Sequence, residues 1–212
     1  RAEFYVRSFG SEGPFYRPGQ GGENVFAEVN GENVSTRRHL AKEKSLASQV
    51  IDSCLALREQ RAQADLDAEF IFPTPLEALE LALQLRPLVE SEQIVLHWPK
   101  GKKFNVIKES DGSQLKVSIR RDKDWFAASG ELKVDEELTI DMMKLLELTE
   151  LSNSRFIELD DGQYLALTDE FRRRIAELNA FAEVKKNTLR FPRVRVAAVE
   201  EVAEGFDLTT DK

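Results

Sequence analysis

The sequence predicts an α+β fold in which antiparallel β-hairpins pack with helices, arranged as two small subdomains. Three Asn-Gly or Asp-Gly pairs, at 30–31, 111–112 and 161–162, lie between short β-prone runs. Such pairs favour tight hairpin turns because they tolerate backbone angles with positive φ. Other segments repeat apolar residues at three- and four-residue steps, which indicates amphipathic helices.

Residues 1–65 form the predicted N-terminal part, a hairpin followed by a long helix. Strands are expected near residues 3–9, 24–29 and 32–36, with a glycine-rich connection before the hairpin. The helix is expected from about Thr36 to Ala62 because apolar residues recur there at helical spacing. Its apolar stripe contains Leu40, Ala47, Ile51, Cys54 and Leu57.

A second subdomain is predicted over residues 70–182, after the polar and acidic segment RAQADLDAEF near 62–70. Its first helix is expected to begin at Pro75, with Thr74 as N-cap and Glu77 completing a capping box. Pro87 is expected to stop or kink this helix because proline lacks the backbone N–H of a helical hydrogen bond.

Residues 93–134 are predicted to be mainly β. Ile94, Leu96 and Trp98 would share one face of a strand, and Asp111-Gly112 would turn the chain between two later strands. A helix follows over 140–151, with Asp141 able to cap it.

Strands ending at Leu159 and Leu167 are then expected around the Asp161-Gly162 turn, followed by a helix capped by Thr168. The inward face of that helix is predicted to contain Phe171, Ile175 and Leu178. Residues 183–212 are interpreted as a basic connector with a short acidic helix, leading towards a further domain.

Composition restricts the classes of protein. A net charge of −8 and a pI near 5.1 argue against a wholly basic nucleic-acid-binding domain, although a local basic face remains compatible. No apolar run reaches the roughly 20 residues of a membrane-spanning helix. Cys54 is the single cysteine, which fits a cytoplasmic protein. The chain begins at Arg1 and ends with TTDK just after a helical pattern, so we expect an excerpt of a longer protein.

Neither catalysis nor metal binding is predicted within these residues. The loop RPGQGGENV lacks the Gly-Lys-Ser/Thr of a nucleotide-binding P-loop and leads into a hairpin, which favours a structural role. His39 and Glu43 lie four residues apart on a predicted helix, but no third ligand is placed with them. Acidic runs such as 135–137 are typical of solvated faces.

Two clusters of basic residues are the candidates for contact with the DNA backbone, because clustered cations release counterions when they bind phosphates. The alternative is that lysines on edge strands prevent edge-to-edge pairing. The candidates are Lys100, Lys102, Lys103, Lys116, Arg120 and Arg121 in the first cluster, and Lys185, Lys186, Arg190 and Arg193 in the second.

Several of these stretches together resemble bacterial Swi/Snf-family helicases, specifically the helicase-associated region upstream of the ATPase core. The resemblance is carried by LHWPKGKKFNV, RRDKDWFAASGELKVDEE, RFIELDDGQYLALTDEFRRRIAEL and the earlier FYRPGQGGENVFAEVNGENVSTRRHLAKE. It extends over most of residues 1–195. The Trp-Pro-x-Gly, Asp-Trp-Phe and DGQYLALT elements carry it in combination.

The resemblance implies a parent protein that hydrolyses ATP with magnesium and moves on double-stranded DNA. The family's P-loop, acidic box and arginine finger are missing from this chain, so no catalytic residue and no cofactor is assigned to it. The zinc ligands of some members are missing too. The function expected for this segment is to position or regulate the adjoining ATPase core, with contact to DNA through the basic clusters. The alternative is a protein-interaction module without nucleic-acid contact.

Overall fold

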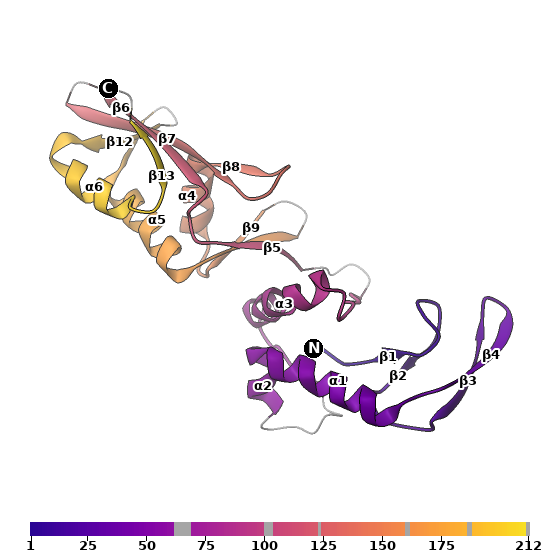
Figure 1. The fold of residues 1–212 in the computed structure, drawn as a ribbon. Coiled ribbons are helices and arrows are strands. Elements are labelled where there is room, and N and C mark those ends of the chain that lie inside the picture. The colour runs from indigo at the N-terminus through magenta and orange to yellow at the C-terminus, as the bar shows by residue number, and fades with distance from the viewer. Residues whose placement is uncertain (62–68, 100–103, 123, 160–161, 186–187, 211–212) are drawn as a thin grey trace. The chain divides into compact units, whose positions relative to one another are not determined.

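Antiparallel hairpins and helices make up the chain, which confirms the predicted α+β class (Figure 1). The computed structural model describes residues 1–61, 69–99, 104–122, 124–159, 162–185 and 188–210. These residues divide into two compact units, Arg1–His97 and Trp98–Lys212. None of the helices in these ranges is long and apolar enough to span a membrane.

The first unit contains two small antiparallel sheets and three helices. The elements are β1 (Val6–Arg7), β2 (Phe15–Tyr16), β3 (Asn24–Val29), β4 (Glu32–Arg37), α1 (Leu40–Ser53), α2 (Leu55–Arg61) and α3 (Pro75–Glu90). Strand β1 pairs with β2, and β3 pairs with β4. Asn30 and Gly31 both have positive φ, at 53° and 82°, which confirms the predicted hairpin turn.

The helices of the first unit enclose its core. The buried residues are Ile51, Cys54, Leu57, Phe70, Leu81 and Leu85, to which α1, α2 and α3 all contribute. The predicted helix over 36–62 is instead two helices, because Cys54 is extended at the end of α1. The side-chain oxygen of Gln84 accepts a hydrogen bond from the Ala56 amide at 3.0 Å, which satisfies a backbone group exposed by this break.

Three features near the end of the first unit differ from, or refine, the sequence predictions. Helix α3 has the predicted Thr74–Glu77 capping box, but it continues through Pro87 to Glu90, because a proline in the last turn removes only one hydrogen bond.

Ile94, Leu96 and Trp98 do not form a strand. The first two pack against the core of the first unit.

The division between the units falls after His97, whereas the predicted boundary near 62–70 falls mostly on residues outside the described ranges. Helix α3 belongs with the first unit because its leucines complete that core.

The second unit contains a six-stranded sheet, a three-stranded sheet and three α-helices. The strands are β5 (Asn105–Ser110), β6 (Leu115–Asp122), β7 (Trp125–Lys133), β8 (Thr139–Asp141), β9 (Phe156–Glu158), β10 (Gln163–Leu167), β11 (Glu183–Lys185), β12 (Thr188–Pro192) and β13 (Asp207–Thr210). The helices are α4 (Met142–Leu151), α5 (Asp169–Phe181), the 3₁₀ turn η1 (Arg193–Arg195) and α6 (Val196–Val202).

Pairing in the second unit is mostly antiparallel, with two parallel exceptions. The larger sheet has the order β11-β12-β7-β6-β13, with β8 beside β7, and β13 runs parallel to β6. The smaller sheet has the order β5-β10-β9, and β5 runs parallel to β10. The turn at Asp111-Gly112 therefore passes the chain between two sheets and does not close a hairpin.

Helices α4, α5 and α6 pack on one face of the larger sheet. Alternate residues of β6, β7 and β12 are buried in a single cluster with the apolar residues of these helices. The cluster includes Leu115, Val117, Leu132, Leu189, Phe191, Leu145, Phe171, Ile175 and Val202. The intervening residues of the same strands consequently point away from the helices.

The C-terminal segment also differs from its prediction as a connector. Strands β11 and β12 extend the larger sheet beyond β7, and β13 returns to pair with β6. Residues 183–210 are thus part of the second unit, because their alternate apolar residues complete its core.

Candidate nucleic-acid interface

The structure describes the side chains of five predicted DNA-contacting residues, all in the second unit. Lys116, Arg120 and Arg121 lie on β6, Arg190 lies on β12, and Arg193 begins η1. Lys185 ends β11, where only its backbone is described. Lys100, Lys102, Lys103 and Lys186 lie outside the described residues.

Two residues from different basic clusters meet in one row across the larger sheet. Arg120 of β6 pairs with Ala127 of β7, and Ala127 pairs in turn with Arg190 of β12. Because direct partners in antiparallel strands have side chains on the same face, both arginines flank the small side chain of Ala127 on one face. That face is the one opposite the helices.

Trp125 lies in the next row of the same face. It pairs with Asp122 on one side and with Pro192 on the other. The guanidinium of Arg190 lies 5.2 Å from the centre of a Trp125 ring, which is within the range of a cation–π contact. The side chain of Arg190 therefore contacts the Trp125 ring at this end of the sheet.

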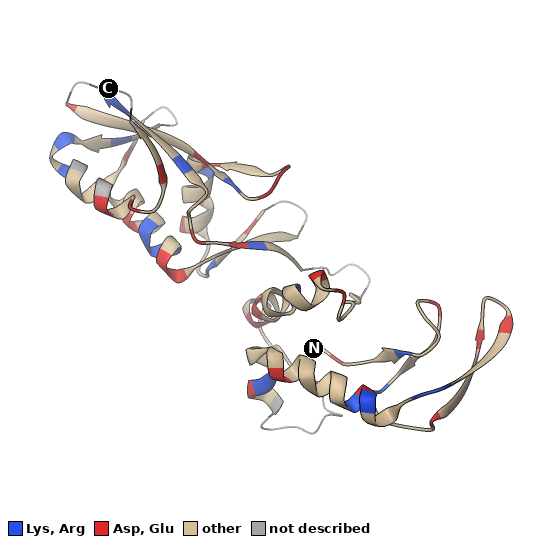
Figure 2. Ribbon diagram, viewed as in Figure 1, with Lys and Arg blue, Asp and Glu red and all other residues tan. Residues whose placement is uncertain are grey.

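Arg193 belongs to the same end of the sheet, beside the turn that joins β6 to β7. Its backbone N–H donates to the carbonyl of Asp124 at 3.2 Å. Arg193 and Arg195 are exposed, and Val194 between them is 91% exposed. Figure 2 shows basic residues on β12 and at its junction with α6. We call Arg120, Arg190 and Arg193 the basic end of the sheet.

Acidic residues are also present at the basic end. Glu183 is the direct partner of Arg190 on β11, and exposed Asp124 lies in the β6–β7 turn. The three arginines of the basic end and the neighbouring Arg195 thus accompany these two carboxylates among the described side chains. The charge of this end is positive within an acidic chain, and it is modest in size.

The other two described candidates are separated from the basic end. Arg121 pairs with Phe126 and therefore lies on the opposite face from Arg120. Lys116 pairs with Glu131 on one side and with Asp207 on the other. Because both of its direct cross-strand partners are acidic, we expect Lys116 to attract phosphate less than Arg120 does.

The alternative explanation for the basic residues, protection of sheet edges, does not apply to Arg190 on β12. Strand β6 lies between β7 and β13, and β12 lies between β11 and β7. Arg190 is paired on both sides, with Glu183 and Ala127, so it does not protect an edge. The pairing of β13 with β6 covers Lys116 to Ile119 and ends before Arg120, so this argument does not extend to Arg120. Lys185 on the terminal strand β11 is at an edge.

The three consecutive arginines of α5 have separate local partners. Arg172 donates to the carbonyl of Ser152 at 3.3 Å, and Arg173 lies 3.9 Å from Glu177. Arg174 forms an ion pair with Glu170 and also donates to the carbonyl of Glu204 after α6. The contacts to Ser152 and Glu204 bind α5 to its neighbours, whereas those to Glu170 and Glu177 lie within the helix. The three arginines form no combined basic patch, as the 100° step between helical residues predicts.

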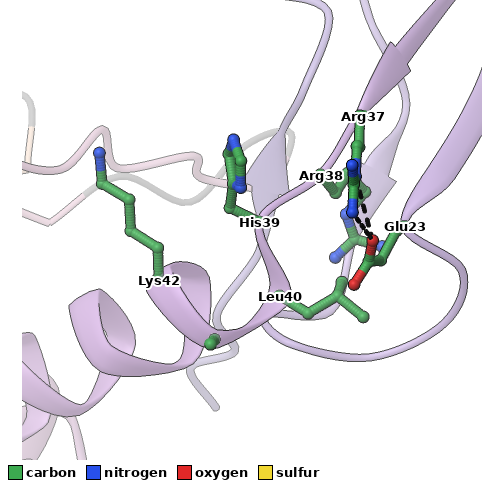
Figure 3. Close-up of a pocket in the computed structure, with 7 residues that line it drawn as sticks. Glu23, Arg37, Arg38, His39, Leu40 and Lys42 are labelled. Carbon is green, nitrogen blue, oxygen red and sulfur yellow. Dashed lines mark hydrogen bonds and ion pairs between the residues drawn. The ribbon is translucent and has the colours of Figure 1, made fainter.

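In the first unit, basic residues gather in a pocket of about 420 Å³ where β4 meets α1 (Figure 3). Arg37, His39 and Lys42 contribute to its lining. Arg37 is engaged with Glu23 at 2.8 Å, at the exposed end of the hairpin. The pocket therefore offers less uncompensated positive charge than its composition suggests.

The glycine-rich loop beside this pocket is held by a buried ion pair. Arg38 is 3% exposed and donates to the carbonyls of Arg17 and Gln20, at 2.9 and 2.8 Å. Its guanidinium also donates to the Glu43 carboxylate, which accepts a further hydrogen bond from the Gly19 amide at 3.0 Å. The loop has a structural role here, as predicted.

These contacts also define the electrostatics of Glu43. Burial by itself would raise the pKa of this carboxyl, but hydrogen bonds from Arg38 and the Gly19 amide hold the pKa below its ordinary value. Glu43 is committed to Arg38, and across the described ranges no group of three or more potential ligands could hold a metal ion.

No protein-family model matches the chain, and neither a curated protein nor a solved structure is significantly similar to it.

Proposed function

We propose that the chain is a non-catalytic accessory region of a bacterial Swi/Snf-type DNA-dependent ATPase, in which it positions or regulates the motor. The proposal is supported by the Trp-Pro-x-Gly, Asp-Trp-Phe and DGQYLALT elements taken together. In this proposal ATP and magnesium belong to the adjoining ATPase core of the same protein. The ATPase core is also the proposed binding partner of this region.

We propose further that the basic end of the sheet contacts the phosphate backbone of double-stranded DNA. The observation that carries this proposal is the row Arg120–Ala127–Arg190, which brings one arginine from each basic cluster to one face. Side chains on a sheet face can approach phosphates, and contacts to phosphates position a protein without selecting a sequence. The binding is therefore expected to be weak, salt-dependent and indifferent to sequence.

The DNA proposal is tested by measuring the affinity of the chain for a labelled duplex over a series of salt concentrations. The double variant Arg120→Glu/Arg190→Glu is expected to lose binding, and Arg193→Glu should weaken it. The control Lys144→Glu/Arg173→Glu changes the net charge equally on exposed helical positions of the same unit. Absence of salt-dependent binding at low ionic strength, or equal losses in both double variants, would reject the proposal.

The family proposal has an independent test in the parent protein. Its reading frame beyond Lys212 is expected to contain a Gly-x-Gly-Lys-Thr-type loop followed by an Asp-Glu box. A full-length protein without these motifs, and without DNA-stimulated ATP hydrolysis, would contradict the family proposal. It would leave the DNA-binding measurement of the chain itself unaffected.

A protein-interaction module without nucleic-acid contact is the second candidate. It is favoured by the net charge of −8 and by the β3–β4 hairpin, on which the Phe26 side chain is 78% exposed. A two-stranded hairpin is marginally stable alone, and an added partner would bury such a ring. Binding of the ATPase core that is lost in Phe26→Asp, together with no DNA binding, would favour this candidate.

A further inference from the structure

One face of the β1–β2 sheet carries two aromatic rings and two arginines in alternating order. Arg7 of β1 pairs with Phe15 of β2, and the antiparallel register continued by one step places Tyr5 opposite Arg17. Direct cross-strand partners share a face, and so do residues two apart on one strand. These four residues therefore form a checkerboard in which each ring has an arginine beside it and the other ring on its diagonal.

The side-chain contacts agree with this arrangement. The Arg7 guanidinium lies 4.2 Å from the centre of the Phe15 ring, and that of Arg17 lies 4.7 Å from the Tyr5 ring. The two rings meet edge to face with their centres 5.5 Å apart. His97 extends the series, with its ring 5.4 Å from that of Phe15. We call Tyr5, Arg7, Phe15 and Arg17 the aromatic–arginine face.

This face is open to solvent. Tyr5 is 46% exposed and Phe15 is 47% exposed. The neighbouring residues Phe4 and Tyr16 point to the other side, where Phe4 packs against the core and Tyr16 lies beneath Arg38. Packing in the core of the first unit thus explains the aromatic residues on the inner face of β1–β2. It does not explain why the outer face carries two exposed aromatic rings.

Arg7 is the arginine whose charge is uncompensated. Arg17 forms an ion pair with Glu3 at 2.6 Å. Arg7 makes no ion pair within the described part of the chain, and its Nε is buried without a hydrogen-bond partner. The Nε atom is covered, so an incoming phosphate would meet the terminal nitrogens of the half-buried Arg7 side chain, which has no acidic partner among the described residues.

We propose that the aromatic–arginine face binds single-stranded nucleic acid. Every base has a flat π-face that can stack on an exposed tyrosine or phenylalanine, and the phosphate between two bases would accept hydrogen bonds from Arg7. Alternating aromatic and cationic groups complement the alternating bases and phosphates of such a strand. Stacked bases inside a duplex cannot use this face, so it differs from the basic end of the sheet, and neither proposal depends on the other.

The sequence contains a recognisable pattern for this face, Tyr-x-Arg in 5–7 and Phe-x-Arg in 15–17. Each triplet by itself is an ordinary feature of an amphipathic strand. Its meaning depends on the antiparallel register, which aligns the two triplets in opposite order and so alternates rings and charges.

The test uses the whole chain and fluorescence anisotropy of labelled oligothymidylate, oligouridylate and a duplex of equal length. Both single strands are expected to bind. Phe15→Leu and Tyr5→Leu should each weaken that binding by about 5- to 150-fold, the loss typical of one base stack. Arg7→Gln should lower the salt slope by about 0.7, the contribution of one phosphate contact on a single strand. Arg7→Lys should retain most of that slope.

Phe26→Leu is the matched control, because Phe26 is also an exposed phenylalanine on a two-stranded sheet but belongs to β3–β4. It is expected to leave the affinity unchanged, with circular dichroism verifying the fold of every variant. A preference for oligouridylate over oligothymidylate would identify RNA as the source of the strand, and the reverse would identify DNA.

Three results would overturn the proposal: no binding of either single strand at low salt, equal affinity of the wild type, Phe15→Leu and Tyr5→Leu, or binding of an acidic aromatic peptide in place of nucleic acid. Arg120→Glu/Arg190→Glu separates this face from the duplex site. This double variant is expected to abolish duplex binding. In its background, Phe15→Leu should still weaken the binding of single strands as much as it does in the wild type.

Discussion

Arg38 and Glu43 form a buried ion pair beneath the glycine-rich loop, with two guanidinium nitrogens donating to the two carboxylate oxygens at 3.0 and 2.6 Å. The pair joins the end of the β3–β4 hairpin to the first turns of α1 and binds the loop through backbone groups. It is thus the structural centre of this part of the first unit, and its removal has predictable consequences.

Glu43→Gln is expected to destabilise the first unit by about 3–5 kcal/mol, because it leaves the buried Arg38 guanidinium without a compensating charge. The measurement is urea unfolding followed by circular dichroism. Glu23→Gln removes an exposed partner of Arg37 and serves as control, with an expected cost of about 0–1 kcal/mol. An equal loss of unfolding free energy in the two variants would show that the buried pair contributes no more to stability than the exposed pair does.

The same pair predicts a dependence on pH. The pKa of Glu43 in the folded state lies below its ordinary value of 4.5. Stabilisation from its ionised form is therefore complete above that value and is lost as the pH falls through the lowered pKa. The stability difference between wild type and Glu43→Gln should be largest near neutrality and shrink below about pH 4.5. Unfolding curves from about pH 7 to pH 3 measure it, and a constant difference contradicts the assignment.

Gly112→Ala is expected to be much more damaging than Gly31→Ala. Both glycines have positive φ, at 87° and 82°. A Cβ on Gly112 would lie 2.5 Å from the Phe171 ring, whereas a Cβ on Gly31 would meet nothing within 4 Å. The strained backbone costs both variants about 1 kcal/mol, and overpacking adds about 1–3 kcal/mol at Gly112 alone. Thermal unfolding compares them, and similar losses would contradict the packing of Phe171 against this turn.

Thr168→Ala is expected to destabilise the second unit by about 1 kcal/mol. The Thr168 hydroxyl caps α5 by accepting a hydrogen bond from the Phe171 amide at 3.2 Å. Thr168→Ser keeps that acceptor and should retain most of the stability. Urea midpoints for the two variants provide the comparison, and a serine variant as unstable as the alanine variant would exclude capping as the cause.

Lys116→Gln and Arg120→Gln should affect duplex binding differently, although both remove one positive charge from β6. Arg120 belongs to the basic end, whereas Lys116 lies between Glu131 and Asp207. Arg120→Gln should therefore reduce the salt slope of duplex binding by about 0.9, and Lys116→Gln should leave it nearly unchanged. Equal slopes for the two variants would place the contact elsewhere.

Local sequence signals predicted many elements of the fold because each acts over a few residues. The Thr74–Glu77 capping box, the Thr168 cap and the Asn30-Gly31 turn are all present. The apolar spacing of Phe171, Ile175 and Leu178 also identified the buried side of α5. Hydrogen bonds within one turn and the backbone preferences of single residues are sufficient for such features.

The pairing partners of the strands could not be predicted from local sequence patterns. The alternation around Asp111-Gly112 indicated two strands correctly, but β5 pairs in parallel with β10 and β6 pairs with β7. Ile94 and Leu96 alternate like a strand and instead pack directly on the first unit's core. Burial against distant segments decides such pairings, and period-two patterns do not identify the partner.

The sequence by itself determined the α+β class, the positions of caps and turns, and the identity of the two basic clusters. Only the tertiary structure decided that Arg120 and Arg190 share a face, that Arg121 does not, and that Lys116 lies between carboxylates. The physical reason is that the electrostatic interaction between two charges depends on their distance in space and not on their separation in the sequence. The order and register of strands, which the burial of their apolar faces selects, convert residues far apart in the chain into neighbours.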